Sequence, residues 1–297
     1  MVIGGATATG KTGVALRIAQ RLNCPILSCD SRQFFQEMTI GTAKPNQEEL
    51  QQATHYFINH LSIQQNYSVG DYERDALAQL DKIYQTKQIA ILVGGSGLYL
   101  QAVCEGFDDF PDVPLAIRTT IEEQYEQKGI EWLQQALRLA DADYYHRTDI
   151  QNPHRLIRAL SVCQASGQPF SSFQQQQPKR ERPFIPIYLL LELERSALYE
   201  RINQRVDTML QQGLMQEAQS LLRYRQHTAL QTVGYQEFFD YFDGAIDLEE
   251  AIRLIKRNSR RYAKRQMTWF RRQTYWRRFH PDQWQEIMIW IEQEITS

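Results

Sequence analysis

Gly5-Ala6-Thr7-Ala8-Thr9-Gly10-Lys11-Thr12 is the segment that decides the fold of this 297-residue chain. The segment has the pattern G-x-x-x-x-G-K-[ST]. A loop with this pattern surrounds phosphate oxygens with backbone N–H groups, a lysine amine and a hydroxyl. Such a loop joins a buried strand to a helix, and both flanks fit: residues 1–3 are apolar, and apolar positions 14, 15, 18, 19 and 22 have helical spacing. The segment therefore predicts a bound di- or triphosphate, with Lys11 on its oxygens and Thr12 as a ligand of Mg²⁺.

Strand and helix signals alternate through the first hundred residues. Apolar runs at 25–29, 55–61 and 89–93 have the length of buried strands, and Ser68 is a typical N-cap for a helix over residues 71–86. This alternation is typical of a parallel sheet flanked by helices. We therefore predict an α/β fold with a P-loop NTPase-like parallel sheet.

The pattern changes at about residue 107. Aspartates and prolines interrupt it, helical patterns continue to about residue 167, glutamines at 174–177 are typical of a linker, and an apolar strand pattern returns at 185–191. Because the strand pattern resumes, we predict an all-helical insertion domain, residues 107–178, within a core formed by residues 1–106 and 179–297. Three or four helices should follow, the last over residues 248–272.

Composition excludes several classes of protein. No apolar run approaches the ~20 residues of a transmembrane helix, and the first residues lack a signal-peptide pattern. The four cysteines have no C-x-x-C spacing and the six histidines are scattered, so neither disulfides nor a metal site built by side chains alone is expected. We expect a cytoplasmic, monomeric protein without a membrane partner.

Basic residues are concentrated in one segment, residues 251–281. It contains eleven lysines and arginines and no aspartate or glutamate, which leaves 22 basic against 35 acidic residues in the rest of the chain. Arg253, Arg257, Arg261 and Arg265 follow one another at intervals of four, and aromatic residues are interleaved with them. A solvated surface would not separate charge in this way. Because cations bind phosphates and aromatic faces stack bases, the segment predicts an RNA-binding surface.

Asp30 is the second candidate site residue, because it directly follows a predicted strand. In parallel sheets, ligands bind beyond the carboxyl ends of the strands, where the phosphate loop also lies. An Asx turn or a helix cap is the alternative role for this aspartate. The strand at 89–93 is followed by Gly94-Gly95-Ser96-Gly97 without an acid. ATP-hydrolysing proteins often place a Mg²⁺-binding aspartate there, so ATP hydrolysis is disfavoured.

Two further segments leave their roles open. Residues 40–45, Ile-Gly-Thr-Ala-Lys-Pro, combine a glycine, a hydroxyl and an amine, and they fit a substrate-binding loop or a plain turn equally well. Arg201 and Arg205 lie four residues apart and share one helix face. They either bind an anion together or remain solvated beside Glu200 and Asp207.

Together these segments resemble the tRNA dimethylallyltransferases (isopentenyl-tRNA transferases) of bacterial type. The zinc finger of the eukaryotic members has no counterpart here, and Phe34-Phe35 stands where Val-Tyr is typical, which removes a hydroxyl. The matching segments occur in the order found in the family: residues 5–12, 30–33, 40–45, 93–99, 152–160, 233–237 and 262–271.

The resemblance implies transfer of a dimethylallyl group from dimethylallyl diphosphate to the exocyclic amine of the adenosine 3′-adjacent to the tRNA anticodon. Residues 5–12 would then hold the diphosphate leaving group, with Mg²⁺ on Thr12 and Arg205 as a further diphosphate ligand. Asp30 would be the general base that accepts the proton of the attacking amine. The adenine would have to leave its stack to reach this site.

The resemblance also implies a surface for the tRNA anticodon stem-loop, over which the helical insertion would close. This surface would comprise Asp30, Ser31, Arg32, Gln33, Ser96, Arg118, His154, Arg155, Leu156, Ile157, Arg158, Gln231, Thr232, Val233, Gly234, Tyr235 and Gln236, together with Arg257, Arg261 and Arg265 of the basic segment.

Three alternatives share some of these features. Adenylate isopentenyltransferases have the loop and the Asp-Ser region but act on free nucleotides and need no tRNA-binding surface. A small-molecule kinase would bind ATP in the loop. An RNA-binding P-loop protein without catalysis would not need Asp30. The insertion and the basic segment favour tRNA as the acceptor.

Overall fold

The computed structural model describes residues 1–106, 108, 110–174 and 181–296 of the chain. It consists of two compact units: Met1–Cys104 with Arg182–Ser297, and Glu105–Glu181. The boundaries expected from the sequence, 107 and 178, and most of the expected linker fall on residues outside the described ones. Within the described residues, no helix is both long and apolar enough to cross a membrane.

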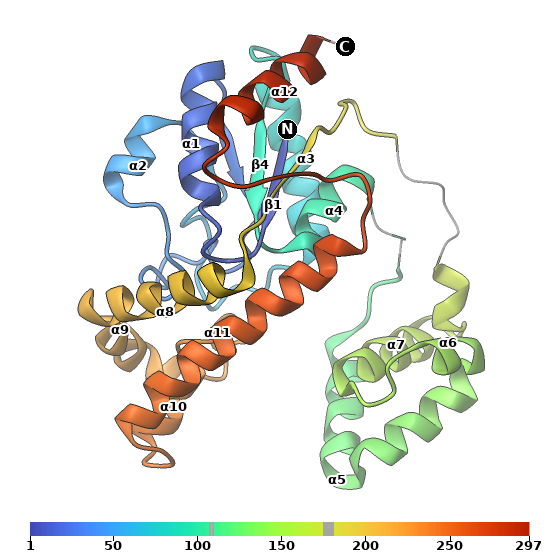
Figure 1. The fold of residues 1–297 in the computed structure, drawn as a ribbon. Coiled ribbons are helices and arrows are strands. Elements are labelled where there is room, and N and C mark those ends of the chain that lie inside the picture. The colour runs from blue at the N-terminus through green and yellow to red at the C-terminus, as the bar shows by residue number, and fades with distance from the viewer. Residues whose placement is uncertain (107, 109, 175–180, 297) are drawn as a thin grey trace. The chain divides into compact units, whose positions relative to one another are not determined.

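The first unit is built on a six-stranded parallel sheet with strand order β3-β2-β4-β1-β5-β6. Figure 1 labels its two central strands, β4 and β1. Because all pairs are parallel, the carboxyl ends of the strands lie at one edge of the sheet. The strands are β1 (Val2–Gly5), β2 (Ile26–Ser28), β3 (His55–Tyr56), β4 (Ile91–Gly94), β5 (Tyr188–Leu191) and β6 (Arg277–Phe279).

Successive strand residues alternate between two apolar cores, one on each face of the sheet. Ile3 packs with α1 (Lys11–Leu22) and α12 (Trp284–Thr296), whereas its neighbour Val2 packs with α3 (Val69–Tyr84) and α4 (Gly97–Glu105). This burial on both faces is why the strands are continuous apolar runs in the sequence. The predicted parallel sheet flanked by helices is confirmed.

Two strands differ from expectation. The strand expected at 55–61 ends after Tyr56, because Phe57 and Asn59 adopt left-handed backbone conformations with φ of 62° and 57°. β6 was not predicted. It pairs with β5 but contains two exposed arginines, Arg277 and Arg278, and only one buried residue, Phe279. An edge strand of this kind carries no apolar run by which the sequence would reveal it.

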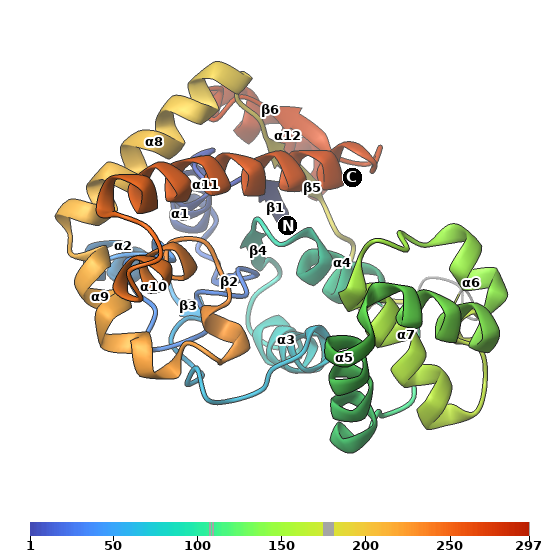
Figure 2. The same cartoon turned by 90° about the horizontal axis from the view of Figure 1, so that it is seen from below.

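Helices after β5 form a third core that reaches the carboxyl edge of the sheet. Leu214, Tyr235, Phe238 and Ile255 are buried there together with Met38 of the loop after β2. The long α11 packs against α8 and α10, as Figure 1 and Figure 2 show. α2 (Gln47–Gln52) lies between β2 and β3. The helical elements between β5 and β6 are α8 (Arg195–Gln211), α9 (Leu214–Leu221), η2 (Leu222–Tyr224), η3 (Thr228–Leu230), α10 (Gln236–Phe242) and α11 (Leu248–Arg271).

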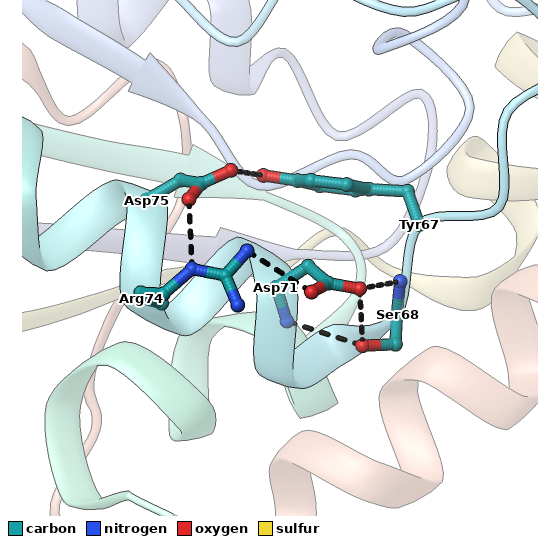
Figure 3. Close-up of polar contacts among 5 residues, drawn as sticks. All are labelled: Tyr67, Ser68, Asp71, Arg74 and Asp75. Carbon is teal, nitrogen blue, oxygen red and sulfur yellow. Dashed lines mark hydrogen bonds and ion pairs between the residues drawn. The ribbon is translucent and has the colours of Figure 1, made fainter.

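The start of α3 confirms the predicted N-cap. Ser68 Oγ accepts a hydrogen bond from Asp71 N at 3.1 Å, and Asp71 Oδ2 accepts one from Ser68 N at 2.9 Å (Figure 3). Arg74 bonds to both Asp71 and Asp75, and Tyr67 donates to Asp75 at 2.9 Å. The reciprocal pair of Ser68 and Asp71 satisfies two backbone donors that the first turn of a helix leaves free.

Arg182 anchors the chain where it re-enters the first unit. Its guanidinium forms a buried ion pair with Glu73 of α3 at 2.5 Å and donates to the Ala102 carbonyl of α4 at 2.8 Å. Ala102 lies three residues before the insertion begins, so one side chain ties the re-entering chain to the helix that leads into the insertion.

The second unit is all-helical, as the sequence predicted. It comprises α5 (Leu115–Ala140), α6 (Ala142–Arg147), α7 (Pro153–Ser166) and η1 (Phe170–Phe173) around a core that includes Leu133, Leu160 and Phe170. Gly129 interrupts α5 with a φ of 76°. Asp141 links α6 to η1. Its buried carboxylate accepts hydrogen bonds from the backbone N–H groups of Tyr144 and Ser171 at 2.9 and 2.6 Å.

Candidate active site

The phosphate loop leaves β1 at the carboxyl edge of the sheet and ends at the start of α1. Gly10 has a φ of 93°, which favours glycine, and it forms the N-cap of α1. Thr9 Oγ1 is fully buried and donates to the Ala6 carbonyl at 2.9 Å, and Lys11 Nζ donates to the same carbonyl at 2.7 Å. The loop is thus held by its own side chains, with the helix dipole of α1 directed at the space in front of it.

A cavity of about 280 Å³ lies in front of this loop, and we call it the phosphate cavity. Several elements at the carboxyl edge contribute to its wall. Its lining includes Thr7, Ala8, Gly10, Lys11 and Thr12 of the loop, Asp30 and Gln33 after β2, Gly94 and Gly95 at the end of β4, Arg201 and Arg205 of α8, and Tyr262 and Gln266 of α11. The structure therefore brings together the predicted phosphate ligands and the predicted base.

The phosphate cavity has an excess of buried positive charge. Burial, and after it the neighbouring Arg205, lowers the pKa of Lys11 to about 7, although Asp30 acts in the opposite direction. Burial also lowers the pKa of Arg205. Arg205 Nη1 donates to Thr7 Oγ1 at 3.2 Å, so the guanidinium is fixed at the loop. Cations held this close in a desolvated cavity favour a bound anion.

Asp30 forms the Asx turn that the sequence allowed, and it also lines the phosphate cavity. Its Oδ1 accepts a hydrogen bond from Arg32 N at 3.0 Å, which is an Asx turn. Within the described residues its Oδ2 accepts no hydrogen bond, and the side chain lines the phosphate cavity. The turn therefore fixes one carboxylate oxygen, whereas Oδ2 has no partner within the described residues.

A second, smaller cavity adjoins the phosphate cavity at Asp30. Its volume is about 100 Å³, and it shares Thr7, Asp30, Thr42, Arg205 and Tyr262 with the larger one. The rest of its lining is largely apolar and includes Ile202, Val206, Met209, Leu214, Val233 and Ile255, with Arg32, Thr232 and Gly234 at its wall. We call it the apolar cavity. Asp30 thus lies where the phosphate cavity meets the apolar cavity.

Gln266 and Glu217 are site residues that the residue-level predictions missed. Gln266 Oε1 accepts from Thr7 N at 2.8 Å and its Nε2 donates to the Gly95 carbonyl at 2.9 Å, so it joins α11 to the phosphate loop and to the end of β4. Glu217 holds the loop after β2 by three backbone amides. Gln266 lies in the matching segment 262–271, whereas Glu217 lies in none of those segments.

The segment 40–45 contributes a wall and not an anion ligand. Thr42 lines both cavities. Lys44, whose amine was a candidate for phosphate, instead donates to the Phe35 carbonyl and to Asn59 Oδ1, the latter at 2.6 Å. Phe34 and Phe35 are buried, at 1% and 7% exposure, so the hydroxyl missing there does not face the site.

Several predicted tRNA-contacting residues have other contacts in the structure. Arg32 Nη1 donates to the carbonyls of Thr228 and Ala229 at 3.1 and 3.0 Å. Tyr235 is fully buried, and Gln236 donates to Gln231 at 2.6 Å. The predicted tRNA-contacting residues of the first unit that line neither cavity are Ser31, Ser96, Gln231, Tyr235, Gln236, Arg257, Arg261 and Arg265.

The insertion contains Arg118, His154, Arg155, Leu156, Ile157 and Arg158. Leu156 and Ile157 are 0% and 8% exposed in its core, so their side chains are unable to contact tRNA, and this part of the prediction is corrected. The error has a physical reason, because these two residues occupy the apolar face of α7, whose charged residues lie beside them in the sequence. For the exposed residues of the segment, a tRNA contact stays a prediction.

In the part of the chain that the structure describes, four of the eleven basic residues in the basic segment form ion pairs. Their partners lie outside residues 251–281, so an acid-free sequence did not reveal them: Arg253 pairs with Glu250, Lys256 with Asp207, and Arg271 and Arg278 with Glu192. Arg260 donates to Asn203 at 2.6 Å. Within the described residues Arg257, Arg261 and Arg265 form no ion pair, which leaves the predicted row available to an anionic partner.

Most aromatic residues of the basic segment are structural. Phe270, Trp276 and Phe279 are buried and are therefore unable to stack on bases, so only part of the aromatic set is available for stacking. A Cβ on Gly4 would lie 2.6 Å from the Phe270 ring, so this part of α11 packs closely on β1. Tyr262 is the exception, because it is 36% exposed and lines both cavities.

The phosphate loop, the carboxyl edge of a parallel sheet and the buried cations beside it define an α/β protein of the P-loop type. The chain belongs to the IPP transferase family, whose model matches residues 33–273. It is 48% identical over 295 residues to the tRNA dimethylallyltransferase of Christiangramia forsetii, with 99% of this chain and 97% of that relative covered. It is 46% identical over 305 residues to the tRNA dimethylallyltransferase of Flavobacterium johnsoniae, with 100% and 98% covered.

Solved structures are similar over most of the chain. A full-length tRNA isopentenylpyrophosphate transferase from Bacillus halodurans has a TM-score of 0.73 at 34% identity, over 99% of this chain and 96% of that one. A eukaryotic dimethylallyltransferase acting on tRNA has a TM-score of 0.75 at 26% identity, over 90% of this chain and 68% of that one. The predicted family, fold class and enzyme class are confirmed: the chain is a member of a family of prenyl-transferring enzymes.

Proposed function

We propose that this protein transfers the dimethylallyl group of dimethylallyl diphosphate to the exocyclic amine of the adenosine 3′-adjacent to the anticodon in tRNA. The observation that carries the proposal is the position of Asp30, where a cavity lined by Lys11, Arg201 and Arg205 meets a second cavity whose unshared lining is largely apolar. The cationic cavity suits a diphosphate, and the apolar one suits a group without charge. A diphosphate ester of a short hydrocarbon has the same two parts, a charged diphosphate and an uncharged hydrocarbon group.

The phosphate loop would bind the diphosphate as a leaving group. Backbone N–H groups of the loop, Lys11 and Arg205 stabilise the charge that grows on the bridging oxygen as the allylic C–O bond breaks. The site is desolvated, so these interactions are stronger than in water. The pKa of Lys11 is about 7 before an anion binds, and a bound diphosphate would raise it, so the amine would be charged in the complex.

Thr12 fits as a protein ligand for Mg²⁺. Its side chain lines the phosphate cavity beside Lys11, in the first turn of α1. Mg²⁺ keeps several waters and takes few protein oxygens when phosphate oxygens are present, so one hydroxyl suffices. Among the described residues, no group of three His, Cys, Asp or Glu side chains offers another metal site. When bound, Mg²⁺ would neutralise charge on the departing diphosphate.

Asp30 would serve as the general base. The adenosine amine attacks the allylic carbon, the bond from that carbon to the diphosphate oxygen breaks, and a proton of the amine passes to Asp30 Oδ2. The Asx turn orients the carboxylate for this step, since Arg32 N holds Oδ1. Because an exocyclic amine is a weak nucleophile, its alignment with the allylic carbon contributes as much as the base does.

The acceptor tRNA would bind through cations outside the cavities. Arg257, Arg261 and Arg265 on α11 support this part of the proposal because they form no ion pair in the described residues, and Arg118 and Arg155 are candidates on the insertion. All residues invoked here come from one chain, so a monomer suffices. With tRNA as its substrate, the protein would act in the cytoplasm.

The proposal is tested by offering three acceptors to the purified protein. Labelled dimethylallyl diphosphate is incubated with unmodified tRNA or with AMP, and labelled ATP is incubated with candidate small molecules. We expect label on an adenosine of the tRNA alone. Label on AMP would identify an adenylate isopentenyltransferase, and phosphoryl transfer from ATP would identify a kinase.

A further inference from the structure

Glu217 of α9 is a carboxylate that binds four donors at the edge of the site. Its Oε2 accepts from Thr39 N and Ile40 N at 3.0 and 2.8 Å, and its Oε1 accepts from Gly41 N at 3.0 Å. Tyr235 Oη donates to Oε1 at 2.7 Å. Hydrogen bonds to an ionised carboxylate are about twice as strong as neutral ones, so this one side chain fixes two segments firmly.

The two segments that Glu217 joins are walls of the apolar cavity. Gly41 and Thr42 line it from the loop after β2, and Thr232, Val233 and Gly234 line it from the segment that leads into Tyr235. Tyr235 is fully buried against this loop, and a Cβ on Gly41 would lie 2.6 Å from its hydroxyl oxygen. Because Gly41 and the Tyr235 ring approach this closely, their contact fixes the distance between the two walls of the apolar cavity.

Hydrogen bonds lead from this loop to Asp30. Gln33 Nε2 donates to the carbonyls of Thr42 and Ala43 at 3.3 and 3.2 Å. Ser28 Oγ donates to Gln33 Oε1 at 3.0 Å, and Asp30 N donates to Ser28 Oγ at 3.3 Å. The position of the Asp30 backbone therefore depends on a loop that Glu217 holds in place.

We propose that Glu217 is a positioning residue: by clamping residues 39–41 and Tyr235 it sets the geometry of the apolar cavity and of Asp30, without touching the substrates itself. Because it lines neither cavity, its removal should leave diphosphate binding at Lys11 and Arg205 intact. A misplacement of about 1 Å at a reacting centre costs on the order of 100-fold in rate. The inference rests on the proposed function, and it concerns the chemical step alone.

The test compares Glu217→Gln with the wild-type protein. An amide keeps one acceptor oxygen, which can hold two of the four donors, and turns its N–H donors toward the other two, so half of the clamp is removed at nearly constant volume. We expect kcat for dimethylallyl transfer to fall about 100-fold, while the Kd of inorganic pyrophosphate by calorimetry changes less than about 3-fold. Hydrogen exchange at the amides of Thr39, Ile40 and Gly41 should accelerate.

Two further variants show whether a loss of kcat comes from the contacts of Glu217. Tyr235→Phe removes one of the four bonds and should lower kcat by a smaller factor than Glu217→Gln. The matched control is Asp71→Asn, which removes a carboxylate that likewise holds backbone N–H and hydroxyl groups, at Ser68, and that lines neither cavity (Figure 3). It should leave kcat unchanged.

The outcomes separate the inference from the proposed function. Full kcat in Glu217→Gln, or a loss of pyrophosphate binding equal to the loss of kcat, would overturn the positioning role. Unchanged exchange at residues 39–41 would overturn the clamp itself. If the wild-type protein labels no tRNA, the proposed function fails, whereas the exchange experiment still decides whether the clamp exists.

Discussion

Arg205 donates a hydrogen bond of 3.2 Å to Thr7, which joins α8 to the phosphate loop across 198 positions of sequence. This contact places a second cation beside Lys11, as the lowered pKa of Lys11 reflects. The site is therefore assembled from residues that sequence spacing leaves unconnected, and the cations Lys11, Arg201 and Arg205 outnumber the one carboxylate, Asp30, in the cavity lining.

Removing Arg205 should weaken diphosphate binding. We expect Arg205→Gln to raise the Kd of inorganic pyrophosphate by roughly 10- to 100-fold, because a charge-assisted hydrogen bond contributes about 1.5–3 kcal/mol. Calorimetry at constant ionic strength measures the change. Arg260→Gln is the control, since Arg260 lies on α11 and donates to Asn203, outside both cavities. Equal affinities for all three proteins would remove Arg205 from the site.

Diphosphate binding should depend on pH through Lys11. Its pKa in the free protein is about 7, well below the ordinary value, chiefly because of burial. A bound anion raises this pKa, so above pH 7 binding must take up a proton and affinity falls as pH rises. Below pH 7 the amine is already charged and the dependence disappears. Calorimetry of pyrophosphate binding in buffers of different ionisation enthalpy counts the protons, and no uptake at pH 8 would contradict the prediction.

The buried pair Arg182–Glu73 should matter more for stability than an exposed pair. Removing one partner leaves a buried charge uncompensated, so Glu73→Ala should lower the free energy of unfolding by about 3–5 kcal/mol. Arg225 and Asp243 form a pair with half-exposed side chains, and Arg225→Ala should cost less than about 1 kcal/mol. Urea unfolding followed by circular dichroism compares them. Replacing both Glu73 and Arg182 by Met should restore much of the stability.

The unpaired cations of α11 should contribute to tRNA binding in a salt-dependent way. Changing Arg257, Arg261 and Arg265 to Gln should weaken binding and reduce the slope of log K against log salt by roughly 0.7–0.9 for each phosphate that the protein no longer neutralises. The matched triple variant changes Arg253, Arg271 and Arg278, whose charges are paired with Glu250 and Glu192. It should change the slope less. Identical slopes would assign the row at 257, 261 and 265 to packing.

Local signals in the sequence predicted the parts of the molecule that local chemistry determines. The phosphate loop has the spacing its chemistry requires, Ser68 caps α3 with Asp71, and α11 spans nearly the residues that its pattern indicated. Asp30 lies at the carboxyl edge, as predicted, because parallel strands end at one side of a sheet.

The sequence patterns did not predict contacts between segments that are far apart along the chain. β6 has no apolar run and forms only because β5 offers an edge. The partners of Lys256 and Arg271 lie on other elements, so the basic segment looked more charged than it is. Glu217 and Gln266 bond to loops that folding brings close; Gln266 lies in the matching segment 262–271, whereas nothing in the sequence around Glu217 marks it.

The most direct test of the proposed mechanism is a single-turnover assay of Asp30→Asn with labelled dimethylallyl diphosphate and unmodified tRNA. We predict that the wild-type protein labels one adenosine. The variant should bind pyrophosphate and tRNA normally but transfer label at least about 100-fold more slowly, as the removal of a general base requires. Transfer by the variant at the wild-type rate, or label on AMP in place of tRNA, would contradict this mechanism.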